Sequence, residues 1–392
     1  MVRLADRMAA MGSNVFADMD RAKQAAVAAG RDLIDLSLGS SDLPTPPHVL
    51  AAIGRSLDDP STHGYLLFRG TLPFRQAAAD WYERKFGLAV DPETEVLPLI
   101  GSQEGTGHLP LALLNPGDYA LLLDPGYPSH AGGVQLAGGQ IYPMPLLAEN
   151  QFLPQFEDIP AAILQQARMM VLSYPHNPTA ATATLAFFRS AVRFCQRHDL
   201  VLVHDFPYAE LVFDGTVPPS VLQADPTLSV SIEFFTLSKS FNMGGFRVGY
   251  AIGNAELITA LRQIKATVDF NQYLGILNGA EAALRGPQTA VTAMVATFRD
   301  RRDALVAALG AIGWAVPTPV AAMYVWAELP EAWAVRSVEF CVELVAQTGV
   351  ALSPGAGFGL AGEGYVRFAL VQEPPRLQEA VRRLAVFLES QV

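Results

Sequence analysis

The sequence predicts an α/β fold in which a sheet is covered by helices on both faces. Short apolar stretches alternate with longer stretches of helical periodicity along most of the chain. Such alternation is typical of a sheet whose strands are joined by crossover helices. Neither a low-complexity linker nor an internal repeat of about 20–50 residues interrupts the pattern.

The expected strands are short apolar runs, and the expected helices carry apolar residues every three or four positions. The strand candidates are 96–100, 119–123, 168–173, 200–204, 232–236 and 247–252. The helix candidates between them are 73–86, 103–114, 183–198 and 256–284. Pro98 is unusual inside a strand, because proline cannot donate to a ladder, and it is acceptable only at the edge of a sheet.

The C-terminal third of the chain changes character, because its helices become longer and its strands fewer. Helix candidates 290–312, 336–348 and 375–390 frame strand candidates near 324–328 and 365–370. This pattern predicts a second, smaller α+β domain, to which we expect the N-terminal segment to add. The expected division is 49–285 for the large domain, and 1–48 with 286–392 for the small one.

Composition favours a cytoplasmic protein without nucleic-acid or membrane partners. The chain has 392 residues, 51% of them hydrophobic, and a formal net charge of -11. No uninterrupted apolar run approaches the ~20 residues that span a bilayer, and Met1–Arg7 lacks the apolar core of a signal peptide. The acidic balance disfavours nucleic acids and anionic membranes.

The two cysteines, Cys195 and Cys341, fall in helix-like stretches. They show no metal-ligand spacing, so we expect buried free thiols and no metal site.

Lys239 is the residue around which a chemical site can be built. It follows an apolar strand candidate and precedes a Gly-rich turn that contains Arg247. An amine in such a pocket can form a Schiff base with an aldehyde cofactor. Thr236, Ser238 and Arg247 would then hold the phosphate of that cofactor. The alternative is a lysine at the edge of the core that reaches solvent beside a structural arginine.

Two further segments supply groups that a pyridoxal phosphate site needs. Asp205 ends an apolar strand candidate, where its carboxylate would pair with the protonated pyridine nitrogen; a helix N-cap is the alternative. Tyr208 and Asn177 would donate to the phenolic oxygen of the cofactor. Asn177 is otherwise part of a simple Asn-Pro turn.

A third segment would bind the phosphate through backbone groups. Ser102, Gln103 and Glu104 begin a helix candidate directly after a strand candidate, and N–H groups at a helix start bind anions. Tyr127, in a Pro/Gly turn, would stack on the pyridine ring or simply anchor its loop.

Together these residues resemble the fold-type-I pyridoxal phosphate enzymes, specifically the class I/II aminotransferases. Five residues occur in the order of the family and at close to its intervals: Asn177, Asp205, Tyr208, Lys239 and Arg247. The resemblance spans nearly the whole chain, from segment 36–39 to segment 364–368. It implies a mostly parallel seven-stranded sheet between helices, a smaller α+β domain, pyridoxal 5'-phosphate as the cofactor, and a homodimer.

The resemblance also implies the catalytic roles. Lys239 would hold the aldehyde and then act as a general base between the substrate Cα and the cofactor. Asp205 and Tyr208 would assist it as catalytic residues. Tyr65 would reach the phosphate of the other subunit, as a C2 dimer allows.

Substrate binding is implied at three positions. Arg367 lies in a strand candidate with period-two alternation, opposite to the apolar face, and would bind the substrate α-carboxylate bidentately. Its alternative is a surface salt bridge. Gly39 and Asn177 would lie beside the substrate. Recognition of the substrate side chain is expected near residues 13–43 and 65–69 and from the partner subunit.

Within the family the chain is similar to the branch of LL-diaminopimelate and glutamate–pyruvate (alanine) aminotransferases. Segments 112–118 and 124–128 suggest the former; segments 62–65, 233–240 and 323–327 suggest the latter. Three positions depart from the branch pattern, which leaves the substrate preference open: Gln103, Ala180 and Asn278.

We expect alanine as the amino donor and 2-oxoglutarate as the acceptor, with LL-diaminopimelate as the alternative donor. Alanine leads because no acid in the sequence can be assigned to the distal ammonium of diaminopimelate. A carbon–sulfur β-lyase or a cyclopropane-forming synthase on the same fold is a further alternative. A cofactor-binding transcriptional regulator is disfavoured, because Gly39 comes too early for a preceding DNA-binding domain and the chain is acidic.

Overall fold

The structure is a computed structural model that describes residues 2–5, 7–10, 15–215 and 217–390. Met1 and Asp6, within the stretch that lacks a signal core, and residues 13 and 14, within the segment expected near the substrate, lie outside the described residues. None of the described helices combines the length and the apolar character needed to span a bilayer.

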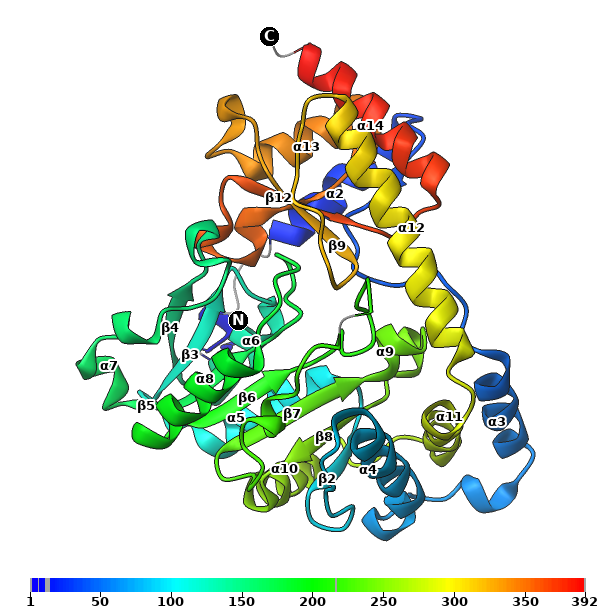
Figure 1. Cartoon of the computed structure of the whole chain (residues 1–392), viewed down its shortest axis with the longest axis vertical. Coiled ribbons are helices and arrows are strands. Elements are labelled where there is room, and N and C mark those ends of the chain that lie inside the picture. Colours follow the sequence, from blue (N-terminus) through cyan, green and yellow to red (C-terminus); the bar gives the residue numbers. More distant parts are fainter. Residues whose placement is uncertain (1, 6, 11–14, 216, 391–392) are drawn as a thin grey trace.

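A mostly parallel seven-stranded sheet forms the centre of the molecule (Figure 1). Its order is β2-β8-β7-β6-β5-β3-β4, and β8 alone runs antiparallel to its neighbours. The strands are β2 (Val96–Leu99), β3 (Tyr119–Asp124), β4 (Gln140–Pro145), β5 (Ala167–Leu172), β6 (Val201–Asp205), β7 (Ser231–Thr236) and β8 (Gly249–Gly253). The expected seven-stranded, mostly parallel sheet is therefore confirmed.

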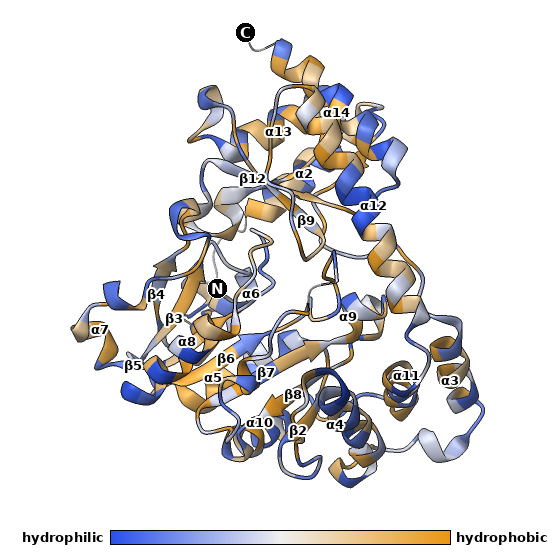
Figure 2. Ribbon diagram, viewed as in Figure 1, coloured by the Kyte–Doolittle hydropathy of each residue, from blue (hydrophilic) through white to orange (hydrophobic). Residues whose placement is uncertain are grey.

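Helices bury both faces of this sheet, because successive strand residues point to opposite sides. Leu121 and Leu123 of β3 pack into one apolar core, and Leu122 between them packs into another. The first core includes α3 (Pro47–Leu57), α4 (Leu72–Phe86), α8 (Leu185–Arg197) and α11 (Leu274–Arg285). The second includes α5 (Ser102–Leu113), α6 (Pro128–Ala137) and α10 (Ala255–Val268). Figure 2 shows the central strands largely in the colour of apolar residues.

The edges of the sheet test two expectations. Pro98 lies in β2, which pairs only with β8, so the edge position is confirmed. The opposite edge, β4, was missed, because its residues mix polar side chains with two prolines and form no apolar run. The single helix expected at 256–284 is wrong: it is divided into α10 and α11, and Phe270 between them has a φ of 59° that no α-helix accommodates.

The remaining elements form a smaller region above the sheet in Figure 1. An antiparallel sheet has the order β11 (Ser353–Pro354), β12 (Tyr365–Ala369), β9 (Tyr324–Glu328). Around it lie α2 (Val15–Ala28), α12 (Thr289–Ala311), α13 (Ser337–Thr348) and α14 (Pro374–Glu389). Strand β1 (Ile34–Asp35) pairs with β10 (Val350–Ala351), which joins the N-terminal segment to the C-terminal part of the chain. The division at 49–285 remains our proposal for the domain boundaries.

Three short helices complete the list: α1 (Arg7–Ala10), α7 (Ala161–Leu164) and α9 (Leu237–Ser240). Cys195 and Cys341 are buried free thiols, as expected.

A fully buried polar network ties β6 and β7 to the loop after β5. Glu233 and His204 are both inaccessible to solvent, and His204 Nδ1 lies 2.7 Å from Glu233 Oε1. The Glu233 carboxylate also accepts from Val221 N at 2.7 Å and from Ser220 Oγ at 2.6 Å. His204 Nε2 contacts the backbone N and O of Tyr174 at 3.2 and 3.1 Å. Because Asn177 follows Tyr174 by three residues, the network supports the loop that carries it.

We predict that Glu233→Ala lowers the free energy of unfolding by about 3 kcal/mol, because it leaves buried partners without an acceptor. Urea unfolding at pH 7 measures this. Glu331→Ala, at an exposed position, is the matched control. Equal stabilities of the two variants would contradict the prediction.

Candidate active site

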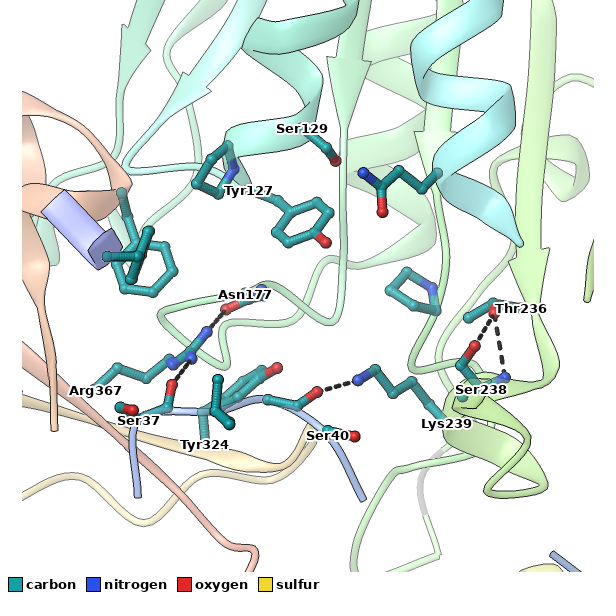
Figure 3. Close-up of a pocket in the computed structure, with 18 of the residues that line it drawn as sticks. Ser37, Ser40, Tyr127, Ser129, Asn177, Thr236, Ser238, Lys239, Tyr324 and Arg367 are labelled. Atoms are coloured by element: carbon teal, nitrogen blue, oxygen red, sulfur yellow. Dashed lines mark hydrogen bonds between the residues drawn. The ribbon is translucent and has the colours of Figure 1, made fainter. Parts of the chain in front are cut away.

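A cavity of about 640 Å³ lies between the sheet and the smaller region. Most of the residues predicted from the sequence line it: Gly39, Ser102, Gln103, Tyr127, Asn177, Asp205, Tyr208, Thr236, Ser238, Lys239, Arg247 and Arg367. Several of them are seen in Figure 3. Glu104 and Tyr65 are not among the lining residues.

Lys239 enters the cavity from α9, directly after β7. Thr236 caps this short helix, since its Oγ1 accepts from Ser238 N at 3.2 Å. The Lys239 ammonium donates to the carbonyl oxygen of Gly39, across the cavity (Figure 3). A segment from the smaller region is thus in direct contact with the lysine.

The environment of Lys239 favours its neutral amine. Burial lowers the pKa of Lys239, because removing an ammonium from water disfavours its charged form. The Tyr324 phenol partly opposes this, and the positive charges of Arg367 and Arg247 lower the pKa of Lys239 further.

Asp205 is the last residue of β6, and only one of its two carboxylate oxygens has a hydrogen-bond partner among the described residues. Its Oδ2 lies 3.0 Å from His130 Nε2. Its Oδ1 is buried and has no hydrogen-bond partner among the described residues. A buried acceptor at the cavity wall fits a group that brings its own N–H, such as a protonated ring nitrogen.

An anion-binding corner forms where β2, β7 and β8 meet. Ser102 begins α5, Gly101 precedes it with a φ of 77°, and the hydroxyls of Thr236 and Ser238 lie 2.9 Å apart. A Cβ at Gly101 would lie 2.6 Å from Arg247 Nη2, so glycine is required for the guanidinium to reach this place. Hydroxyls, a helix start and a guanidinium together suit a phosphate.

Arg367 lies at the other end of the cavity. Its Nη1 donates to Asn177 Oδ1 at 2.7 Å, and its Nη2 donates to the Ser37 carbonyl at 2.7 Å and to Ser353 Oγ at 3.2 Å. The guanidinium lies over the Tyr324 ring at 4.2 Å. Arg367 is 5% exposed, and its hydrogen bonds among the described residues go to neutral oxygens, so the structure shows no surface salt bridge at this position.

Tyr324 is a cavity residue that the sequence reasoning missed. Its hydroxyl lies 2.7 Å from the hydroxyl of Tyr208, and both phenols are buried. Segment 323–327 had only marked a family resemblance. The signal that could have found Tyr324 is its strand, β9, which pairs with the strand of Arg367.

Glu104 was wrongly grouped with Ser102 and Gln103. Its carboxylate is turned away from the cavity and contacts Lys265 Nζ at 2.9 and 3.0 Å. Its N–H is used within α5, donating to the Gly101 carbonyl at 3.1 Å, so it is not free for an anion.

Tyr65 lies outside the cavity of its own chain. It is 94% exposed and contacts the ring of Phe270 edge-on, with 6.3 Å between ring centroids. A role in another subunit stays a prediction.

Comparison with known proteins identifies the family to which the chain belongs. Residues 31–384 match the model of the family described as aminotransferase class I and II. A protein named LL-diaminopimelate aminotransferase from Dehalococcoides mccartyi is 45% identical over 360 residues, 92% of each chain. A structure of a probable N-succinyldiaminopimelate aminotransferase from Thermus thermophilus superposes with a TM-score of 0.90 at 41% identity, covering 95% of this chain and 99% of the other.

Substrate-bound BacF from Bacillus subtilis is similar as well, with a TM-score of 0.95 at 35% identity, covering 99% of this chain and 98% of the other. The family match covers most of the chain. The cavity holds Lys239, the Asp205 carboxylate with its Oδ1 unpartnered among the described residues, and the anion-binding corner, which together suit the cofactor of this family. The chain therefore belongs to the class I and II aminotransferases, pyridoxal-phosphate-dependent enzymes of fold type I.

Proposed function

We propose that this aminotransferase moves an amino group from LL-diaminopimelate to 2-oxoglutarate, as an enzyme of the cytoplasm. The observation that carries the proposal is the name shared by relatives 40–45% identical over at least 92% of the chain. Alanine was expected from the sequence because no acid could be assigned to a distal ammonium. That reason no longer holds, because Asp20 lines the cavity.

The proposed cofactor contacts follow from the geometry. Asp205 would hold the ring nitrogen through its unpaired Oδ1. Ser102, Thr236, Ser238 and Arg247 would hold the phosphate. When bound, pyridoxal phosphate supplies an aldehyde and an electron-withdrawing ring.

Lys239 would move the proton at the substrate Cα. A general base must be neutral before it accepts a proton, and burial, by lowering the pKa of Lys239, shifts the amine towards that state. Tyr208 and Asn177 would both donate to the phenolic oxygen of the cofactor. Each is held by a neighbour at 2.7 Å, Tyr208 by Tyr324 and Asn177 by Arg367.

Arg367 would bind the α-carboxylate. To do so, its Nη1 exchanges the amide oxygen of Asn177 for a carboxylate oxygen, and its unpartnered Nε is a second free donor. A guanidinium binds a carboxylate more strongly than it binds the neutral amide oxygen that is replaced, because donor and acceptor then both carry charge.

We further propose that the enzyme is a homodimer in which Tyr65 completes the site of the partner. Tyr65 is 94% exposed, its ring contacts that of Phe270, and Leu67, two residues on, is also exposed. Exposed apolar side chains that gather together favour protein contacts. The Tyr65 phenol does not line the cavity of its own chain.

Steady-state kinetics with 2-oxoglutarate test the substrate. We predict kcat/KM for LL-diaminopimelate at least about a hundredfold above that for alanine, ~2.7 kcal/mol of transition-state preference. N-succinyl-LL-diaminopimelate is the second donor to measure, because a structural relative bears that substrate in its name. A higher kcat/KM for the succinylated donor, or for alanine, would overturn the proposal.

Gel filtration with light scattering is expected to give a dimer. Tyr65→Phe should weaken pyridoxal phosphate binding by about tenfold, since a hydrogen bond to a charged group is worth ~1.5 kcal/mol. Tyr142→Phe, on the edge strand β4 away from the cavity lining, is the control. An active monomer would contradict the proposal that Tyr65 completes the site of the partner subunit.

Removing the Lys239 amine should stabilise the cofactor-free protein at neutral pH. A lysine whose pKa is lowered by folding is protonated more readily in the unfolded chain, so it opposes folding below its unfolded pKa of about 10.4. The gain in thermal stability from Lys239→Met should be largest near pH 7 and shrink as the pH rises towards that value. Melting curves from pH 7 to 10, at fixed protein concentration, test it; a variant less stable than wild type at pH 7 contradicts it.

A further inference from the structure

One face of α2 forms a second polar wall of the cavity. Phe16, Met19, Asp20 and Lys23 all line it. Their spacing of three and four residues places them on the same side of a helix. Segment 13–43 was expected near the substrate side chain, and helix α2 within it presents these residues to the cavity.

A charged cluster reaches the cavity at this wall: Asp20, Lys23 and Ser37 line it, whereas Asp35 lies behind them. Lys23 Nζ is 2.8 Å from Asp20 Oδ1, 3.1 Å from Asp35 Oδ2 and 3.3 Å from Ser37 Oγ. The three partners use all three donors of the ammonium. Two carboxylates face one cation, so the cluster carries a net negative charge.

The members of this cluster differ in freedom. The Lys23 side chain is 11% exposed and the Asp35 side chain 24%, whereas that of Asp20 is 61% exposed. Asp35 also accepts from the N–H and the hydroxyl of Ser37. Lys23 and Asp35 are therefore fixed, and Asp20 is the member that can turn towards a ligand.

Ser37 connects the cluster to Arg367. Its carbonyl accepts from Arg367 Nη2 at 2.7 Å, and its hydroxyl faces Lys23. Apolar side chains lie on the same cavity wall, among them Phe16, whose ring centroid is 5.3 Å from that of Phe358. A substrate held at Arg367 can thus run its methylene groups along apolar surface and end at the charged cluster.

We propose that this cluster recognises the distal end of the substrate, a carbon that bears both an ammonium and a carboxylate. Asp20 exchanges Lys23 for the ammonium, and Lys23 exchanges Asp20 for the carboxylate, so every charge keeps a partner. This inference rests on the proposed function and assigns the residues that bind the distal ammonium and carboxylate of the substrate.

The exchange explains why both signs are needed. A distal carboxylate alone takes a donor of Lys23 but leaves Asp20 facing it, and an ammonium alone draws Asp20 away from Lys23 without replacing it. The Lys23 side chain is 11% exposed, so losing Asp20 without a replacement is costly, and a distal carboxylate beside Asp20 is repelled. Either partial substrate is therefore disfavoured.

The test compares donors that differ by one group. L-2-aminopimelate lacks only the distal ammonium of LL-diaminopimelate, and L-lysine lacks only the distal carboxylate. Asp20→Asn should lower kcat/KM for LL-diaminopimelate by at least about tenfold and leave that for L-2-aminopimelate unchanged or higher. Asp20→Glu should retain the preference for LL-diaminopimelate over L-2-aminopimelate.

Asp18→Asn is the matched control. Asp18 lies on the same helix, pairs with Arg21 and does not line the cavity, so both donors should react as with wild type. Lys23 is left intact, because it also joins α2 to β1 and its loss would disturb the fold.

The outcomes separate the two proposals. If wild-type enzyme does not favour LL-diaminopimelate over alanine and the succinylated donor, the proposed function fails. If it does, and Asp20→Asn keeps the wild-type preference over L-2-aminopimelate, the inference is wrong while the function stands. An equal loss with both donors would show that Asp20 only supports the fold, and also overturns the inference.

Discussion

The direction of the strands decides where this active site forms. Strands β5, β6 and β7 run parallel, so their carboxyl ends meet at one edge of the sheet. Asn177, Asp205 and Lys239 come from these ends or from the turns just after them. Residues that are 28 and 34 positions apart in sequence thereby share one cavity, as the geometry of open α/β sheets requires.

Strand β8, which runs opposite to its neighbours, also contributes to this edge of the sheet, through its beginning and not its end. Because β8 is antiparallel, it begins at the edge where its neighbours end, and Arg247 precedes its first residue by two positions. Strand β2 again ends at this edge and is followed by Gly101. The contact between Gly101 and the Arg247 guanidinium is a consequence of these two directions.

Local sequence signals were sufficient for six of the seven strands of the sheet, but not for β4 or for the surroundings of the sheet. Apolar runs such as 168–173 predicted buried strands, and polar residues at their ends predicted the cavity. Strand β4 has no such run, and the break at Phe270 has no proline or glycine to announce it. Glu104 shows what spacing cannot predict. Its position in the first turn of α5 was expected, but its side chain contacts Lys265 on α10 instead of the cavity.

The residues that sequence reasoning missed all depend on packing between distant segments. Tyr208 and Tyr324 are 116 positions apart. Asp20 lies on α2, which packs against the distant helix α13 and is followed by β1, the partner of β10. No local pattern reports such contacts.

The prolines at the two borders of the sheet bear on how the protein behaves while it folds. Pro98 lies in β2, and Pro143 and Pro145 lie in β4, so both border strands lack some of the N–H groups that a neighbouring chain would use. An open border is a template for pairing with other molecules, and proline there interrupts it. These prolines, one in a strand that was predicted and two in the strand that was missed, are expected to protect a partly folded chain from aggregation.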